Sequence, residues 1–264
     1  MRQSFLGLPT ALVLSAVCSL VLVPVAARAE SAPACNAPAN LARFDQPLSR
    51  TSQHLAAGLP VTIVAIGSSS TAGAFASSSA ASYPSRLEVE LRERFPAAAI
   101  TVLNRGANGE EAADMLARLD KVLAETPDLI IWQVGTNAVL RDHNIDTSGT
   151  LIREGLMRMK ATGADVVLMD PQFSPKVIAK PDAERMVDLI NATAKTENVD
   201  LFHRFAVMRS WVETEHIGFE TFVSPDGVHM NDWSYGCVAK VLAMAITEAA
   251  TRATAVAGAG APRF

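Results

Sequence analysis

Short apolar segments alternate with amphipathic segments along most of this 264-residue chain. Continuous apolar runs of four to seven residues are typical of strands that are buried on both faces of a parallel sheet. Such runs occupy residues 61–66, 99–103, 129–134 and 166–169, and a weaker one occupies 199–202. The spacing between them leaves room for one helix after most strands.

The segments between these runs place apolar residues at helical spacing, with charged residues on the opposite face. They predict helices over residues 84–95, 110–125, 147–161 and 182–197, and residues 231–250 predict a final helix. Parallel strands that alternate with helices require right-handed crossovers, and the helices then cover both faces of the sheet. The pattern therefore predicts a three-layer α/β/α domain with a doubly wound parallel sheet.

The first 29 residues have the features of an export signal. Arg2 provides a basic start, residues 6–25 are mostly apolar, and residues 27–29 form a small-x-small cleavage site. A retained membrane anchor is the alternative, but two prolines and a short apolar core favour cleavage, after which no stable membrane insertion is expected. We therefore expect a periplasmic or secreted protein.

The rest of the chain divides by composition into three parts. We expect an N-terminal arm without clear periodicity, a single hydrolase-sized domain and a flexible tail rich in Ala, Gly and Pro. These parts span residues 30–57, 58–250 and 251–264. The 235 residues that remain after cleavage fit one α/β domain with a full core, and nothing in the sequence specifies an oligomeric state.

Charge and cysteine content narrow the function classes. Cleavage removes Arg2 and Arg28 and no acidic residue, so the net charge changes from −4 to −6, which does not favour nucleic acid or anionic lipid as a partner. Cys35 and Cys237 remain, and in an oxidising compartment they favour one disulfide, with two free buried thiols as the alternative. No second Cys or His stands at ligand spacing, so we expect no metal and no cofactor.

Polar residues gather just after the predicted strands, which is where parallel sheets bind ligands. A serine hydroxyl becomes a nucleophile only when a base removes its proton and an acid holds that base. Of the five histidines, only His229 follows a carboxylate, Asp226, by three residues in a turn that contains glycine. The Gly-Ser-Ser-Ser-Thr turn after the first strand supplies candidate nucleophiles for this pair.

Four of these polar segments resemble, in order, the sequence blocks of the SGNH, or GDSL-type, hydrolases. This family of esterases and lipases has a flavodoxin-like sheet, and the resemblance extends over about residues 60–250. The matching segments are Gly67–Thr71, Asn104–Gly109, Gly135–Asn137 and Asp226–His229. Four blocks in order are far more specific than any one of them.

The resemblance implies a role for each matching residue. Ser69 would be the nucleophile, His229 the base and Asp226 the acid, while the oxyanion hole would consist of the N–H groups of Ser69 and Gly109 and the side-chain amide of Asn137. Two positions depart from the family pattern, because Ser68 and Ala138 stand where the family commonly has Asp. Neither departure removes a group from the expected reaction, since the acids at these positions of the family support the loops.

Several polar and aromatic residues have competing interpretations. Ser68, Ser70 and Thr71 are expected to bond the loop backbone or cap a helix. Asp170 is a weaker candidate than Asp226 for the acid, since the neighbouring Pro171 and Gln172 indicate a loop residue on the substrate side. We expect Trp132 in the core, whereas four other aromatic residues fit a pocket or the core equally well. These four are Phe75, Tyr83, Phe173 and Trp233.

The sequence therefore predicts an exported serine esterase that cleaves short acyl esters, above all acetyl, on a carbohydrate or cell-wall polymer through an acyl-enzyme. An aryl esterase, a thioesterase or a lysophospholipase of the same family is the alternative. Outside this class, a phosphate-binding protein using residues 67–73 lacks the lysine of a phosphate loop. A non-catalytic carbohydrate-binding protein would not need the complete set of site residues.

Overall fold

The computed structural model describes Met1 and residues 32–259, with side chains up to residue 252. The chain divides into two units, Met1–Pro33 and Ala34–Phe264, and the second holds the whole fold described below. Except for Met1, the predicted export signal lies outside the described residues. Among the helices of the described part, none has the length and hydropathy that crossing a bilayer requires.

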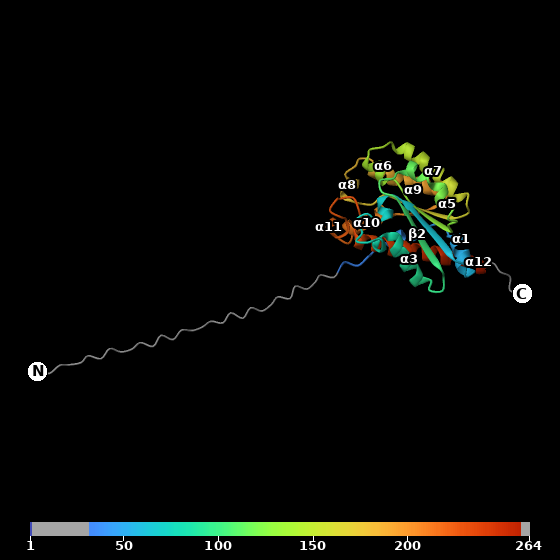
Figure 1. The fold of residues 1–264 in the computed structure, drawn as a ribbon, viewed down its shortest axis with the longest axis horizontal. Coiled ribbons are helices and arrows are strands. Elements are labelled where there is room, and N and C mark those ends of the chain that lie inside the picture. Colours follow the sequence, from blue (N-terminus) through green and yellow to red (C-terminus); the bar gives the residue numbers. More distant parts are fainter. Residues whose placement is uncertain (2–31, 260–264) are drawn as a thin grey trace. The chain divides into compact units, whose positions relative to one another are not determined.

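A single sheet of five parallel strands forms the centre of this unit, in the order β2-β1-β3-β4-β5 (Figure 1). The strands are β1 (Val61–Gly67), β2 (Ile100–Gly106), β3 (Leu129–Gln133), β4 (Asp165–Met169) and β5 (Asp200–Phe202). All five predicted strands are present, and their order is that of flavodoxin-like sheets. Their apolar side chains are almost entirely buried, as is Trp132 in β3.

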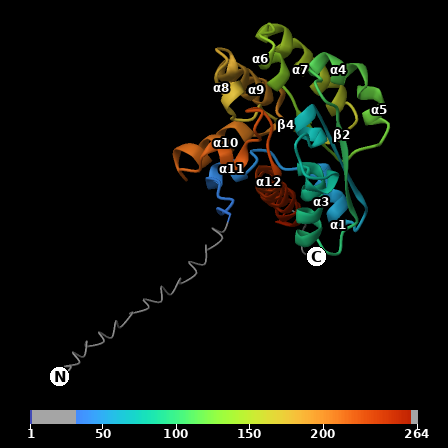
Figure 2. The same ribbon diagram turned by 60° about the vertical axis from the view of Figure 1, so that its left-hand side comes forward.

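Helices cover both faces of the sheet, as the alternating pattern predicted. Figure 2 shows α1, α3 and α12 on one side and α4, α5, α7 and α9 on the other. The first group is α1 (Ser49–Ala56), α3 (Tyr83–Arg94) and α12 (Asp232–Ala259). The second is α4 (Ala112–Ala117), α5 (Leu119–Leu123), α7 (Ile145–Lys160) and α9 (Ala183–Glu197). The predicted three-layer α/β/α fold is confirmed.

The helix predicted over residues 110–125 is in fact two short helices, α4 and α5, which meet at Arg118. The backbone of Arg118 leaves the helical region, with φ −112° and ψ 6°. Its guanidinium binds the carboxylate of Glu110 and donates to the carbonyl oxygen of Arg105, 2.8 Å away. This contact with the loop after β2 holds the chain where the helix breaks, and local periodicity does not reveal it.

The ends of the domain also differ from the prediction. The arm contains a 3-10 helix, Ala39–Ala42, and the helix α1. Helix α1 is anchored by Thr51, whose N–H and hydroxyl both donate to the carboxylate of Asp165. The last helix continues to Ala259, so its predicted end at residue 250 is wrong; the many alanines there favour continuation.

The predicted disulfide is confirmed, since Cys35 is bonded to Cys237.

Candidate active site

The predicted site residues lie at the carboxyl edge of the sheet, where the strand order reverses. Because β2 lies on one side of β1 and β3 on the other, the loops after β1 and β3 diverge and leave space between them. Ser69 begins the short helix α2 (Ser69–Ala72) directly after β1. Asn137 lies in the first turn of α6 (Thr136–Leu140) after β3. The sheet topology therefore places the two residues at the same opening.

Ser69, His229 and Asp226 are joined by two consecutive hydrogen bonds. Ser69 Oγ lies 2.8 Å from His229 Nε2, and His229 Nδ1 lies 2.5 Å from Asp226 Oδ2. An ionised carboxylate only accepts, so Nδ1 carries the proton and Nε2 is free to accept from the serine hydroxyl. Residues 160 positions apart in the sequence thus form one proton path from serine to carboxylate.

The local turn around Asp226 keeps its carboxylate ionised. Its Oδ1 accepts hydrogen bonds from the backbone N–H groups of Val228, at 3.1 Å, and His229, at 3.0 Å. Partial burial alone would raise the pKa of Asp226, but the hydrogen bonds from His229 and Val228 outweigh it and lower this pKa below its ordinary value. A carboxylate that stays charged can orient the imidazole and stabilise its protonated form.

The loop after β2 is held between α2 and α6. Asn137 Nδ2 donates to the carbonyl oxygen of Glu110 at 2.8 Å, and Arg141 Nη2 donates to that of Gly109 at 2.9 Å. Gly109 has φ +76°, a conformation that glycine adopts without strain. A side-chain amide has two N–H donors, so Asn137 keeps one for a ligand after bonding Glu110.

This loop also approaches the predicted nucleophile closely. The N–H of Ala107 donates to the carbonyl oxygen of Gly67 at 2.9 Å, which extends the pairing of β1 and β2. A Cβ on Gly106 would lie 2.1 Å from the backbone nitrogen of Ala72, so only glycine lets α2 pack here. Ser69, Gly109 and Asn137 therefore lie at the same carboxyl edge of the sheet. In the described part of the chain, the N–H groups of Ser69 and Gly109 donate to no acceptor.

Gln133, at the end of β3, is a site-supporting residue that the sequence reading missed. Its Oε1 accepts from the N–H and the hydroxyl of Ser68, both at 2.9 Å, and from the hydroxyl of Thr71 at 3.2 Å. Ser68 stands where the family commonly has Asp, and here it fastens the nucleophile turn to the neighbouring strand. The hydroxyls of Ser68 and Thr71 thus support the loop through the side chain of Gln133. The expectation that they bond the loop backbone or cap a helix is wrong, because Ser68 makes no side-chain cap bond to α2.

Phe75 is an aromatic residue that contacts the predicted base. Its ring stacks on that of His229, although 56% of Phe75 is exposed. The loop that carries it is fastened to α12 by two contacts, in which Ser77 Oγ donates to Asp232 at 2.5 Å and Tyr235 Oη donates to the carbonyl oxygen of Ala74 at 2.7 Å. Of the other aromatic candidates, Tyr83 is fully buried and Phe173 is nearly so.

Asp170 does not compete with Asp226 for the histidine. It is fully buried, and its Oδ1 accepts from the N–H of Phe205 at 2.8 Å. Burial raises the pKa of Asp170 to about 7, although Phe205 and the nearby Arg204 act in the opposite direction. The interpretation of Asp170 as a substrate-side loop residue is wrong, because its side chain is fully buried and bonds the first turn of α10 (Arg204–Glu213).

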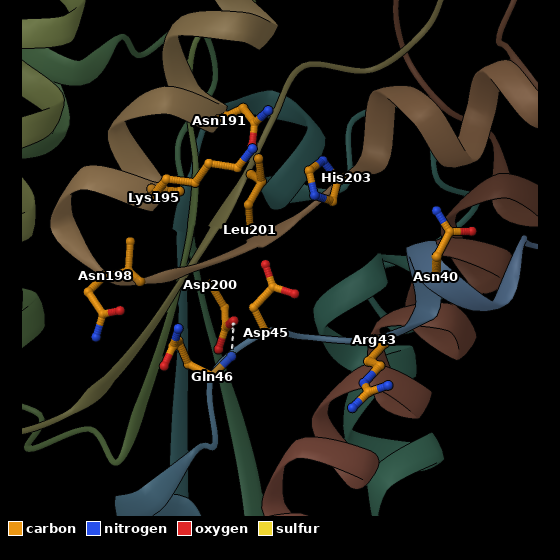
Figure 3. Close-up of a pocket in the computed structure, with 12 residues that line it drawn as sticks. Asn40, Arg43, Asp45, Gln46, Asn191, Lys195, Asn198, Asp200, Leu201 and His203 are labelled. Carbon is orange, nitrogen blue, oxygen red and sulfur yellow. Dashed lines mark hydrogen bonds between the residues drawn. The ribbon is translucent and has the colours of Figure 1, made fainter.

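A polar pocket of about 320 Å³ lies apart from these residues, at the edge strand β5 (Figure 3). It is lined mainly by the 40–46 segment, the C-terminal half of α9 and β5, and includes none of Ser69, Asp226 and His229. Asp200 Oδ1 there accepts from the N–H of Gln46 at 2.9 Å, as the dashed line in Figure 3 shows. No cluster of three potential metal ligands occurs among residues 32–252.

Residues 34–252 match the family described as non-GDSL lipase-like. The chain belongs to this family. The resemblance to SGNH hydrolases is confirmed, and Ser68 in place of the usual Asp agrees with the family description. A stretch of 107 residues is 28% identical to an arylesterase from Vibrio mimicus and covers 40% of this lipase-like chain. The match spans about half, 53%, of the length of that curated relative.

Solved structures similar to this lipase-like chain share its fold. A two-domain esterase, CEX, described as active on acetylated mannans and co-crystallized with mannopentaose, has a TM-score of 0.65 and 22% identity, covering 80% of this chain and 56% of that one. The acetylxylan esterase Axe2 from Geobacillus stearothermophilus has a TM-score of 0.59 and 19% identity, covering 69% of this chain and 91% of that one. At such identities the likeness extends to the fold alone.

Proposed function

We propose that the protein is a serine esterase in which Ser69 is the nucleophile, His229 the general base and Asp226 the acid that orients it. The observation that carries this proposal is the continuous pair of hydrogen bonds from Ser69 through His229 to Asp226. Membership of a lipase-like family supports ester bonds as the target. The order of events follows from these contacts.

In the first half of the reaction, His229 Nε2 takes the hydroxyl proton while Ser69 Oγ attacks the ester carbonyl carbon. The oxygen of the tetrahedral intermediate is stabilised by the N–H groups of Ser69 and Gly109 and by the second N–H of Asn137. Collapse of this intermediate breaks the bond to the alcohol, which leaves with the proton from His229. The acyl group stays on Ser69.

In the second half, water replaces the alcohol. His229 removes a proton from the water, whose oxygen attacks the acyl-enzyme carbonyl, and the same three donors stabilise the second tetrahedral intermediate. Its collapse releases the carboxylic acid and returns the proton to Ser69 Oγ. Because the pKa of Asp226 is lowered, its carboxylate stays ionised beside the imidazolium in both halves.

As substrates we propose short acyl esters, above all acetyl, of carbohydrate or cell-wall polymers. Phe75 supports this choice because its exposed ring offers a flat apolar surface beside His229, on which the C–H face of a sugar can pack. Structures with the same fold are described as esterases of acetylated mannans and acetylxylan. Export to the periplasm or the exterior fits the Cys35–Cys237 disulfide, which persists in oxidising compartments.

An aryl acetate is the second candidate substrate, because the curated relative is an arylesterase and the Phe75 ring can also stack on a phenol. Comparing kcat/KM for phenyl acetate and an acetylated xylooligosaccharide distinguishes the two. The carbohydrate proposal requires the sugar ester to be the better substrate. A clear preference for phenyl acetate would assign the protein to aryl esters.

Variants of the serine turn test the mechanism itself. Ser69→Ala should lower kcat on p-nitrophenyl acetate by at least about 10³-fold and abolish fluorophosphonate labelling, since no other hydroxyl among the described side chains bonds His229. Ser68→Ala serves as the matched control and should stay within about tenfold of the parent, because its hydroxyl only bonds Gln133. An inactive Ser68→Ala beside an active Ser69→Ala would contradict the assignment.

A further inference from the structure

A fully buried arginine lies beneath the proposed active site. Arg204 is the first residue of α10 and has no exposed surface. Its guanidinium makes three hydrogen bonds of 3.0 Å, to Ser70 Oγ, to Gln172 Oε1 and to the carbonyl oxygen of Asp170. The three acceptors follow β1 and β4, so this one side chain connects two loops at the carboxyl edge of the sheet.

Gln172 extends the connection to two further segments. Its Oε1 also accepts from the hydroxyl of Thr136 at 2.9 Å, and its Nε2 donates to the carbonyl oxygen of Val228 at 3.2 Å. Gln172 and Thr136 are both buried, so water does not compete for these bonds. Arg204 and Gln172 thus form one buried polar network.

Each end of this network adjoins a residue of the proposed reaction. Ser70 follows the nucleophile Ser69, Thr136 precedes the oxyanion donor Asn137, and Val228 precedes the base His229. These three segments come from distant parts of the sequence, and catalysis requires their groups to be held within about 0.5 Å of the productive arrangement. The network reaches the first two segments through the side-chain hydroxyls of Ser70 and Thr136, and the third through the backbone carbonyl of Val228.

Stability alone does not account for a cation at this place. Burial lowers the pKa of Arg204 to about 10, which still leaves it charged at neutral pH. Buried charged groups are often replaced by apolar side chains with no loss of stability, because desolvating the charge costs as much as its contacts return. A planar guanidinium, however, can hold three acceptors in a fixed arrangement, which no apolar side chain can do.

We infer that Arg204, acting with Gln172, is a positioning residue that holds the nucleophile, the oxyanion amide and the histidine in register. This inference rests on the proposed function. Removing the network deletes none of the reacting groups, but it makes their relative positions less fixed. We therefore expect a loss in kcat, with KM largely preserved, rather than a loss of substrate binding.

Thr136 offers the mildest test, because Thr136→Val keeps the shape and removes only the donor to Gln172. We expect kcat on p-nitrophenyl acetate to fall about tenfold, with KM within about twofold of the parent, since small misplacements of reacting groups are costly. Thr136→Ser keeps the hydroxyl and should restore at least half of the parent kcat. Equal kcat values for the Val and Ser variants would overturn the inference.

Arg204→Met tests the centre of the network, and Arg252→Met is its matched control. Arg252 also donates to two backbone carbonyls, those of Phe44 and Gln46, but fastens α12 to the N-terminal arm. We expect Arg204→Met to lower kcat by about 30- to 100-fold per folded molecule, and Arg252→Met to lower only the Tm. An Arg204→Met enzyme with parental kcat and a lowered Tm would show a merely structural role.

The outcomes separate this inference from the proposed function. A parent protein that neither hydrolyses p-nitrophenyl acetate nor reacts with a fluorophosphonate disproves the function. An active parent whose Arg204 and Thr136 variants keep the parental kcat disproves the positioning role alone. If Arg204→Met does not fold, the comparison of Thr136→Val with Thr136→Ser still decides.

Discussion

The ring of Phe75 lies nearly parallel to the imidazole of His229, with the ring centroids 5.3 Å apart and an interplanar angle of 20°. Phe75 adopts φ +64°, a backbone conformation that is unfavourable for a bulky residue. The contacts of Ser77 with Asp232 and of Tyr235 with Ala74 hold the loop in this conformation. An exposed aromatic ring is thus fixed at the proposed base, where it can contact both the substrate and the imidazole.

Replacing Phe75 should therefore weaken binding of the sugar part of the substrate. For Phe75→Ala we expect KM for an acetylated xylooligosaccharide to rise about 3- to 10-fold, because aromatic contacts are worth about 0.5–1.5 kcal/mol. Phe75→Trp should keep the parental KM, and Leu59→Ala, which removes another exposed apolar side chain, is the control. An unchanged KM in Phe75→Ala would show that the ring does not contact the sugar.

Asn137→Ala should slow the chemical step. Loss of one oxyanion donor typically lowers kcat by about 10²- to 10³-fold, and we expect this fall with little change in KM on p-nitrophenyl acetate. The variant also loses the bond to the carbonyl of Glu110, so the Tm must be measured alongside. A folded Asn137→Ala with nearly parental kcat would exclude the amide from the oxyanion hole.

The length of the acyl chain should not improve the substrate. Phe75 is exposed on the His229 side, and an open site buries few of the CH₂ groups that would each contribute about 0.8 kcal/mol. We therefore expect kcat/KM for p-nitrophenyl esters to fall, or stay level, from acetyl to octanoyl. A steady increase of several-fold per two carbons would instead indicate a lipase or a thioesterase.

Asp170 should make the fold more stable in mildly acidic than in alkaline solution. Burial raises its pKa from 3.8 to about 7, so between these pH values the folded state holds a proton that the unfolded chain has lost. The free energy of unfolding therefore decreases as pH rises through this interval. Asp165 and Asp200, whose pKa values are also raised by burial, act in the same direction.

The variant Asp170→Asn isolates this effect, because its amide oxygen can still accept from the N–H of Phe205. We expect the free energy of unfolding, measured with urea, to decrease from pH 5 to pH 8 in both proteins. The decrease should be smaller in the variant than in the parent by at least about 1 kcal/mol. Identical decreases in the two proteins would mean that Asp170 does not titrate in this range.

The Cys35–Cys237 disulfide should stabilise the fold because it lowers the conformational entropy of the unfolded chain. It closes a loop with a sequence separation of 202 residues, for which the chain-entropy model gives up to about 5 kcal/mol. The double variant Cys35→Ser/Cys237→Ser should unfold at lower urea concentration yet keep the parental kcat, since neither residue adjoins the proposed site. Two free thiols in intact-mass analysis of the oxidised, secreted protein would contradict the bond.

Some features of this fold have local causes and others do not. The apolar runs predict all five strands because burial on both faces requires them, and Asp226 and His229 stand out because one short turn carries both. Arg204 and Gln172 have no such signal, since their partners Ser70 and Val228 lie 134 and 56 residues away.

The helices that the sequence reading missed have the same kind of explanation. The break at Arg118 depends on Glu110 and Arg105, which belong to the preceding loop. Helix α1 is short and polar, and its Thr51 finds a partner only in Asp165, across 114 residues. Long-range polar contacts decide these elements, and no local pattern of apolar residues records them.

The bond between Cys35 and Cys237 turns most of the domain into a covalent ring. All five strands lie inside this ring, together with Ser69, Asn137, Asp226 and His229. A protease that cuts one exposed loop within the ring therefore cannot release either fragment while the disulfide is intact. In a protease-rich exterior the nicked protein would persist as a two-chain form with all of its reacting groups still tethered, and it would separate only under reducing conditions.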